Sequence, residues 1–193
     1  MNSMKVRTWG TRGSVSVSGP DKVRYGGNTT CIEVISDCIQ KGNGLVVDGG
    51  TGFVPCTDSL LGRGIMKVNV LMTHEHHDHT MGIPLSGHPF IDGAHTSVWG
   101  PHEHGVGPLE MLEYLFRPPM FPVDFRTLKH RFSTHNLAVI GTQVLLIHPI
   151  GGFQLHQASV FKQAEATGRQ LTFAGGKKFI FWEFFCSCNF IYI

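Results

Sequence analysis

A histidine-rich segment decides the fold assignment: residues 73–79 read Thr73-His74-Glu75-His76-His77-Asp78-His79. The segment directly follows an apolar run at residues 68–72, which has the composition of a fully buried strand. In an extended backbone His74 and His76 project to the same side, so both imidazoles reach one metal ion. Asp78 and His79 come as the chain turns towards a helix, where they face a second ion. Because paired ions about 3.5–4 Å apart hydrolyse esters and phosphodiesters, the segment predicts a hydrolytic metal centre rather than a solvated turn.

The composition fits a single folded domain. The chain has 193 residues, 41% of them hydrophobic and 16% charged, with a formal net charge of +2. This length is enough to bury a core without disulfide bonds. The near balance of charge argues against a dedicated nucleic-acid or membrane-surface protein, and the low charge content argues against disorder.

The cysteines and the N-terminal residues favour a cytoplasmic protein. The five cysteines are odd in number and show no Cys-x-x-Cys spacing, which is typical of reduced thiols. Residues 1–10 contain no apolar stretch of a secretory signal, and no apolar run reaches the roughly 20 residues that span a bilayer. We therefore expect a cytoplasmic protein without membrane contact.

Short strands separated by glycine-rich turns dominate the rest of the chain. A helix is expected to begin near Thr80, and a longer one is expected over 108–116, where Pro118 and Pro119 end it. Strands are expected at residues 5–9, 31–35, 45–47, 68–72, 144–147 and 171–174.

The sequence resembles the metallo-β-lactamase fold superfamily, in its phosphodiesterase-like branch near the cyclic-phosphate phosphodiesterases and tRNA 3′-processing enzymes. The histidine motif carries the resemblance to the superfamily. The segments that indicate the branch lie at residues 9–14, 24–29, 47–52, 99–101, 120–123 and 148–152. The resemblance covers about residues 4–174. It implies an α/β fold, an αββα sandwich of two packed sheets with flanking helices.

The resemblance also implies metal ligands. It assigns His74, His76 and His148 to a first zinc, and Asp78 and His79 to a second. His148 has separate support, since it ends the apolar run at 144–147. Asp48 matches an aspartate that supports the metal loop from behind the ligands, and it is also a candidate N-cap for a helix over 51–61. Zinc is the expected ion, one or two per chain, with Mn²⁺ or Fe²⁺ as alternatives.

Residues 175–193 depart from the pattern of the superfamily. Where relatives carry an aspartate that bridges the two metals, this chain has Gly175 and Gly176, and no histidine follows His156. Residues 177–193 begin with two lysines and continue as a run rich in aromatic residues. We therefore expect a partial metallo-β-lactamase-like domain over residues 1–174, incomplete at its C-terminus, followed by an atypical aromatic tail over 175–193.

These features predict a metal-dependent hydrolase that acts on phosphodiester bonds through a zinc-bound hydroxide. Its substrate would be a small phosphodiester or nucleotide-like molecule, and Asp78 would orient the attacking water. The alternative is a catalytically impaired metal-binding fragment that lacks the bridging aspartate and the last histidine. A homodimer, in which a partner chain completes the site, is a further hypothesis. Residues 102–104, His-Glu-His, repeat the two-histidine spacing and are interpreted as a surface loop.

Overall fold

The structure is a computed structural model that describes residues 4–137, 143–148, 152–157, 171–172, 178–179 and 190–192. Beyond residue 137 it describes the course of the backbone alone. The chain divides into two compact units. One unit comprises Met4–Ile35 and Lys41–Leu137, and the other contains Ser36–Gln40 and Ala138–Ile193.

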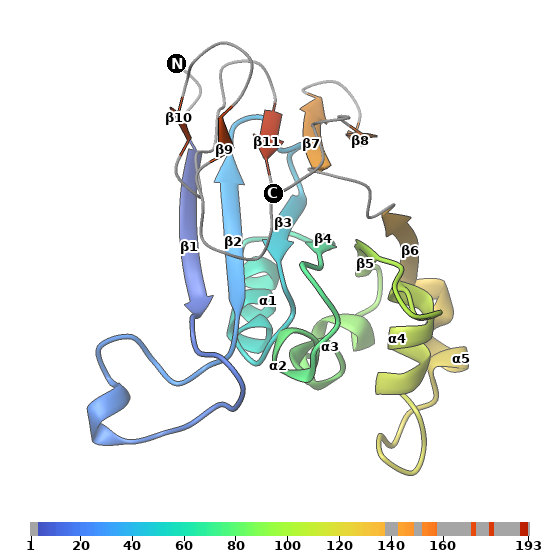
Figure 1. Cartoon of the computed structure of the whole chain (residues 1–193). Coiled ribbons are helices and arrows are strands. Elements are labelled where there is room, and N and C mark those ends of the chain that lie inside the picture. Colours follow the sequence, from blue (N-terminus) through green and yellow to red (C-terminus); the bar gives the residue numbers. More distant parts are fainter. Residues whose placement is uncertain are drawn as a thin grey trace. The chain divides into compact units, whose positions relative to one another are not determined.

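The first unit is built on a six-stranded sheet of order β1-β2-β3-β4-β5-β6 (Figure 1). The strands are β1 (Met4–Gly10), β2 (Cys31–Ser36), β3 (Asn43–Val47), β4 (Lys67–Leu71), β5 (His95–Pro101) and β6 (Phe132–Leu137). Strand β2 is antiparallel to β3, whereas β3, β4, β5 and β6 run parallel. The carboxyl ends of β3, β4 and β5 therefore meet at one edge of the sheet, and the loops that follow these strands lie together.

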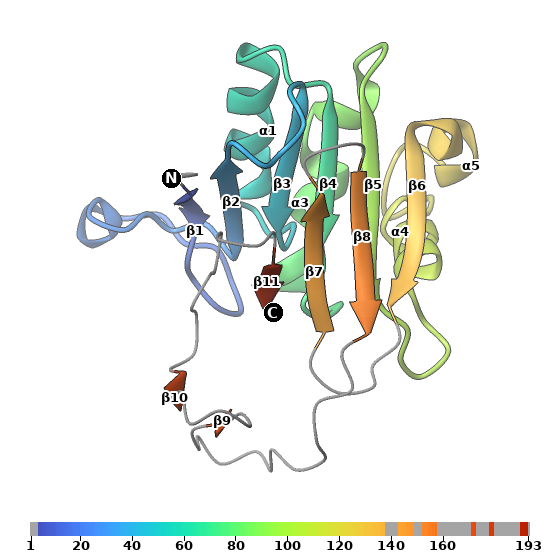
Figure 2. The same cartoon turned by 90° about the horizontal axis from the view of Figure 1, so that it is seen from above.

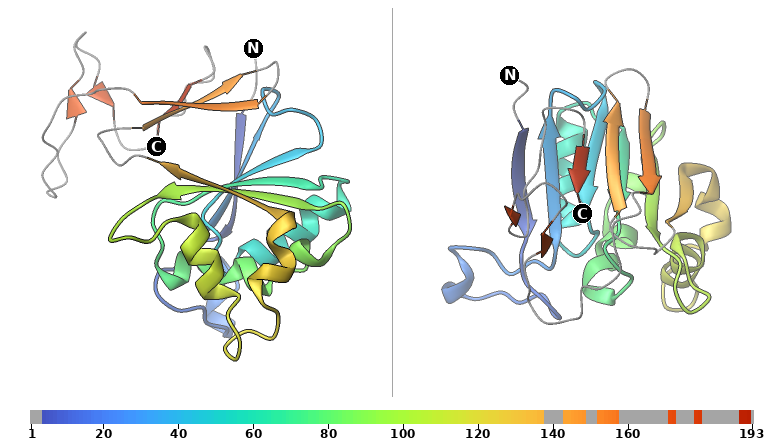
Figure 3. Two further views of the ribbon diagram at one scale, coloured as in Figure 1. Left: turned by 90° about the vertical axis from the view of Figure 1, so that its right-hand side faces the viewer. Right: turned by 45° about the horizontal axis from the view of Figure 1, so that its top comes forward.

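Five α-helices belong to this unit and lie on one face of its sheet (Figure 3, left). They are α1 (Phe53–Gly62), α2 (His77–Thr80), α3 (Gly82–Leu85), α4 (Pro108–Leu115) and α5 (Phe125–Leu128). Single 3-10 turns lie at η1 (Pro20–Lys22), η2 (His88–Phe90) and η3 (Lys129–Arg131). No helix within the described ranges has the length and apolar character needed to cross a membrane.

The core of the first unit lies between the sheet and these helices. Strands β3 and β4 contribute Val46, Val68 and Val70, which are almost completely buried. Phe116, at the end of α4, packs edge-on against Phe121 and Phe132, with ring centroids 5.1 and 5.7 Å apart. The apolar run that precedes the histidine motif is therefore a central strand of this core, which fixes the position of the loop that follows it.

The second unit contains an antiparallel three-stranded sheet of order β11-β7-β8. Its strands are β7 (Gln143–His148), β8 (Gly152–Gln157) and β11 (Phe190–Tyr192), and Figure 2 shows β7 beside β8. A separate antiparallel pair is formed by β9 (Leu171–Thr172) and β10 (Lys178–Phe179).

Candidate metal centre

Two loops at the carboxyl edge of the parallel strands build the candidate site. The loop after β3 begins with Asp48, and the loop after β4 carries the histidine motif and runs into α2. Backbone hydrogen bonds join the two loops: the Asp48 amide donates to the Leu71 carbonyl (2.9 Å), and the Gly49 amide donates to the His79 carbonyl (2.6 Å). His76 is still extended and His77 begins α2, so the chain turns inside the motif as expected.

Asp48 lies behind the motif and orients it. Its side chain is only 2% exposed, and its Oδ1 accepts a hydrogen bond from the Thr73 amide at 2.8 Å. Its Oδ2 lies 2.8 Å from Nδ1 of His79. With Nδ1 engaged by a carboxylate, Nε2 is the nitrogen of His79 left to bind an ion, which is the usual arrangement behind metal-binding histidines. Asp48 does not cap a helix: α1 begins at Phe53, after Gly52, without a side-chain cap.

His74 and His76 form one converging pair of donors. The Nε2 of His74 lies 3.0 Å from the Nδ1 of His76, and the two rings meet edge to face with centroids 4.4 Å apart. Two nitrogens bound tetrahedrally to one zinc at 2.0–2.1 Å are about 3.3 Å apart. The separation of this pair is close to that value, so both nitrogens are placed to bind one ion.

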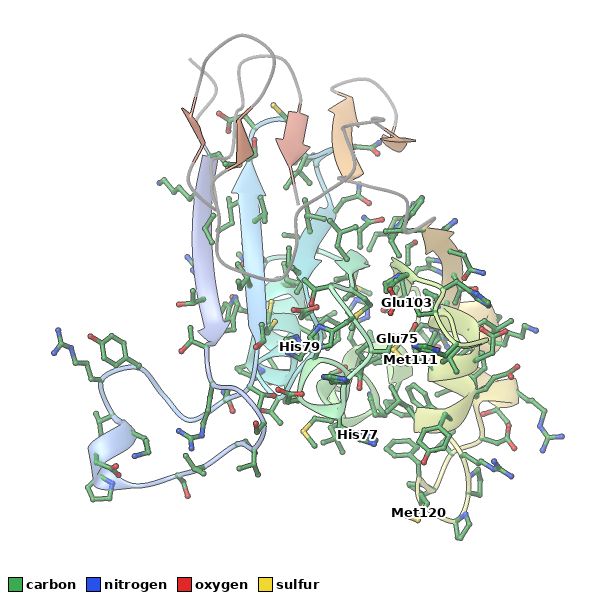
Figure 4. All side chains as sticks on the ribbon, viewed as in Figure 1. Glu75, His77, His79, Glu103, Met111 and Met120 are labelled. Carbon is green, nitrogen blue, oxygen red and sulfur yellow. The ribbon has the colours of Figure 1, made fainter. Side chains whose placement is uncertain are left out.

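Asp78 and His79 form a second converging pair. The Nε2 of His79 lies 3.6 Å from Oδ2 of Asp78, and the His79 ring lies against the His74 ring with centroids 4.1 Å apart. His79 lies within the short helix α2, near the end of the sheet (Figure 4). The four side chains therefore form one continuous cluster with two donor pairs.

The donors present fit a divalent metal but do not complete a site by themselves. Within residues 4–137 no group of three or more His, Cys, Asp or Glu side chains is placed to hold one ion. A catalytic zinc takes three protein ligands, so each pair needs a further donor. His148 ends β7, the strand-end position expected for it. Its side chain lies outside the described part of the chain, and its assignment as a ligand stays a prediction.

The electrostatics of the cluster favour metal binding. Partial burial, followed by the neighbouring His79 and His76, lowers the pKa of His74, which keeps the imidazole neutral and able to bind a cation. The pKa of Asp78 is lowered chiefly by a hydrogen bond from the backbone amide of Ser14, 2.7 Å from Oδ2. The carboxylate is therefore held in its ionised form, the form that binds metals.

Glu75 and Ser14 are features of the site that the sequence did not indicate. The Oε1 of Glu75 is buried without a hydrogen-bond partner in the described part of the chain. Burial, and then the nearby Glu110, raise the pKa of Glu75. Ser14 contacts Asp78 through its backbone amide, so the pattern of side chains in the sequence does not predict this contact. The residues 102–104 are exposed, as expected for a surface loop.

No protein-family model matches the sequence. Three curated relatives are hydroxyacylglutathione hydrolases of Actinobacillus pleuropneumoniae, from serotypes 5b, 3 and 7. Each is 35% identical over 82 residues, which is 39% of this chain and 33% of the relative. The chain thus spans about a third of the length of the curated relatives that it matches.

Three solved structures are similar in fold. The metallo-beta-lactamase fold protein YhfI from Bacillus subtilis is 16% identical with a TM-score of 0.44, over 79% of this chain and 56% of that one. Unliganded yeast PDE1 is 16% identical with a TM-score of 0.46, over 74% and 52%. A diphosphatase from the PhnP family is 18% identical with a TM-score of 0.41, over 79% and 62%.

The six-stranded sheet with helices on one face is an α/β fold, and the histidine motif lies at the carboxyl end of its strand β4. The predicted resemblance to metallo-β-lactamase fold proteins and the predicted α/β class are both confirmed.

Proposed function

We propose that this chain is a metal-dependent hydrolase that acts on phosphodiester bonds. The observation that carries the proposal is the convergence of His74 Nε2 with His76 Nδ1, and of Asp78 with His79 Nε2, at the carboxyl edge of the sheet. The hydroxyacylglutathione hydrolases that share 35% identity with part of the chain are hydrolases, which supports the reaction type.

Zinc is the ion best suited to this set of imidazoles and carboxylate. A bound zinc supplies a water whose pKa is lowered to about 7, and hence hydroxide at neutral pH. The resemblance implies His74, His76 and His148 as ligands of this ion, and His79 and Asp78 as ligands of a second. Mn²⁺ and Fe²⁺ accept the same ligands.

The side chains of the cluster divide the remaining work. Asp78, whose Oδ2 accepts a hydrogen bond from the Ser14 amide, would orient an attacking water beside His79 by accepting a hydrogen bond from it. Asp48 fixes the tautomer of His79 through Nδ1, so that Nε2 stays an acceptor. The substrate fitting this chemistry is a small phosphodiester or nucleotide-like molecule, whose negative charge favours a site with cationic metal.

A metal-binding chain with impaired turnover is the second candidate. Gly175 and Gly176 occupy the place where the resemblance puts an aspartate that bridges two ions. Without that carboxylate a second ion is held more weakly and the attacking hydroxide is less well placed. This candidate predicts metal binding without measurable hydrolysis.

Hydrolysis of bis(p-nitrophenyl) phosphate by the zinc-loaded protein tests the proposal. We expect zinc-dependent turnover that falls at least 100-fold in His76→Ala and survives in His77→Ala. His77 is the matched control because it lies in the same motif with an exposed side chain. Turnover that persists in His76→Ala would overturn the proposal, and zinc binding without turnover would favour the second candidate. A change in mass on adding zinc, measured by light scattering, would test whether a homodimer completes the site.

A further inference from the structure

The loop between β1 and β2 contributes a group to the candidate site. This loop, residues 11–30, extends from the sheet beyond the end of β1 (Figure 1). Its Ser14 amide donates a hydrogen bond of 2.7 Å to Oδ2 of Asp78, 64 positions along the chain. The same Oδ2 converges with the His79 Nε2. The Ser14 amide therefore contacts the carboxylate of Asp78, which the proposed function assigns as a ligand of the second ion.

Ser14 holds an uncommon backbone conformation to make this contact. Its φ is 67°, in the left-handed region, where residues other than glycine are rare. Strained backbone of this kind persists where the surrounding structure imposes it, and such residues gather at functional sites. The Arg12 side chain supports the turn, since its Nε donates to the Val15 carbonyl at 2.8 Å.

Close backbone packing holds the loop of residues 11–30 against the loop that follows β3. The amide of Thr29 donates to Oγ1 of Thr51, and the amide of Thr51 donates to Oγ1 of Thr29, both at 2.8 Å. Gly50 donates to the Thr30 carbonyl at 2.9 Å. A Cβ on Gly50 would overlap the carbonyl oxygen of Asp78. The loop and Asp78 are thus connected through the segment that follows β3.

The two arms of the loop are also joined to each other. The Arg12 amide donates to the Asn28 carbonyl at 3.1 Å, and the Val17 amide donates to the Gly27 carbonyl at 3.0 Å. A Cβ on Gly27 would overlap the Val17 carbonyl oxygen, whereas a Cβ on Gly13 would meet open space. Glycine at position 27 is therefore required for the closure that presents the Ser14 amide.

We propose that the backbone amide of Ser14 is a positioning group for Asp78, which it holds in the orientation that converges with His79. This inference rests on the proposed function, because it concerns the second donor pair of that site. Oδ2 retains a lone pair when it accepts one N–H, so the hydrogen bond orients the carboxylate without occupying it. Outer partners of this kind contribute 10–100-fold to metal affinity.

Replacing the Ser14 amide N–H by an ester oxygen in the full chain tests the proposal. Zinc is added to metal-free protein, and the imidazole ¹⁵N signal of His79 is followed by NMR. We expect the ester to weaken zinc binding at His79 10–100-fold. An ester at Val15 is the matched backbone control, since it weakens the same turn and leaves the Ser14 amide in place.

Glycine substitutions give a second test of the proposal that does not require an ester. Gly27→Ala is expected to weaken zinc binding at His79, whereas Gly13→Ala leaves it unchanged. In metal-free protein, Asp78→Ala is expected to move the Ser14 amide proton upfield, and His77→Ala is not.

The outcomes separate this inference from the function on which it rests. Equal zinc affinity in the wild type and the Ser14 ester would overturn the positioning role alone. A Ser14 amide shift that does not respond to Asp78→Ala would also overturn it. A wild-type protein whose histidines do not respond to zinc at all would overturn the proposed function together with this inference.

Discussion

Asp48 is the residue on which the candidate site depends most. Its Oδ1 accepts a hydrogen bond from the Thr73 amide at 2.8 Å, and its Oδ2 lies 2.8 Å from Nδ1 of His79. The side chain is only 2% exposed. Its φ of 60° places it in the left-handed region, which aspartate tolerates better than most residues. Asp48 thus connects the loop after β3 with both ends of the histidine motif.

Asp48→Ala tests this role. The substitution leaves the Thr73 amide and His79 Nδ1 without their acceptor, so the free energy of unfolding of metal-free protein should fall by roughly 2–4 kcal/mol. Zinc affinity should fall about 10–100-fold. Urea unfolding and zinc titration measure the two effects. Asp58→Ala, at an exposed position of α1, should change stability by less than about 0.5 kcal/mol, and an equal loss there would contradict the assignment.

The buried His88 should make the free energy of unfolding depend on pH. Its side chain is fully buried, with Nδ1 3.0 Å from Oγ1 of Thr96, and burial lowers its pKa. In the unfolded chain this imidazole takes up a proton near pH 6.5, which the folded state resists. Stability should therefore fall as the pH drops from 7 through 6.5 towards the lowered pKa. The neutral form, and the full stability, are present above this range.

His88→Asn isolates this contribution by keeping a polar partner for Thr96 without a titrating ring. Urea unfolding between pH 7 and 5 should show a slope smaller than in the wild type by up to about 1.4 kcal/mol per pH unit. A residual slope is expected, because burial also lowers the pKa of His74, His95 and His135. Identical slopes in the two proteins would contradict the account.

At the scale of elements, α3 depends on close contact between backbones. Gly82 donates to the Gly49 carbonyl at 2.8 Å, and a Cβ at this position would overlap the Gly50 carbonyl oxygen. Gly82→Ala should therefore destabilise the protein by roughly 3 kcal/mol or more. Gly62→Ala is the control, because its Cβ meets open space at the end of α1. It should stabilise the protein by about 0.5–1 kcal/mol, and urea midpoints compare the two.

The elements around the site were predictable because local sequence determines them. The strand expected at 68–72 is β4 (Lys67–Leu71), and the helix expected at 108–116 is α4 (Pro108–Leu115). Pro108 starts α4, and the Glu110 side chain accepts from the Gly107 amide at 3.0 Å. Strand β6 was not predicted, because its sequence Phe-Ser-Thr-His-Asn-Leu lacks apolar alternation. Its strand form comes from parallel pairing with β5, which is a long-range contact.

Within the site, the convergence of the motif side chains was predictable, whereas the contacts that hold these side chains in place were predictable only in part. Spacing alone predicts that His74 and His76 face one ion, and the structure brings Nε2 and Nδ1 to 3.0 Å. Asp48 was expected either to support the metal loop or to cap a helix. The helix cap is wrong because the left-handed turn at Asp48 points the carboxylate to Thr73 and His79. The Ser14 contact depends on a backbone conformation, which side-chain patterns do not encode.

At the scale of the whole molecule, the fold class was predictable and the division of the chain was not. The resemblance to the superfamily indicated an α/β fold, which the six-stranded sheet and its helices bear out. The chain forms two compact units, one of which ends at Leu137 while the other also contains Ser36–Gln40, and the sequence around residue 137 offers no linker composition. The domain expected over residues 1–174 and the atypical tail over 175–193 stay predictions, as do the ligand roles of His74, His76, Asp78, His79 and His148.

Zinc binding by the metal-free full chain tests the central claim most directly. Calorimetric titration of the wild type, His76→Ala and His77→Ala compares a proposed ligand with a matched neighbour in the motif. We predict at least one tightly bound zinc per chain, an affinity reduced at least 100-fold in His76→Ala, and unchanged binding in His77→Ala. A wild type that binds no zinc, or a His76→Ala variant that binds it as tightly as the wild type, would contradict the assignment of this cluster as a metal centre.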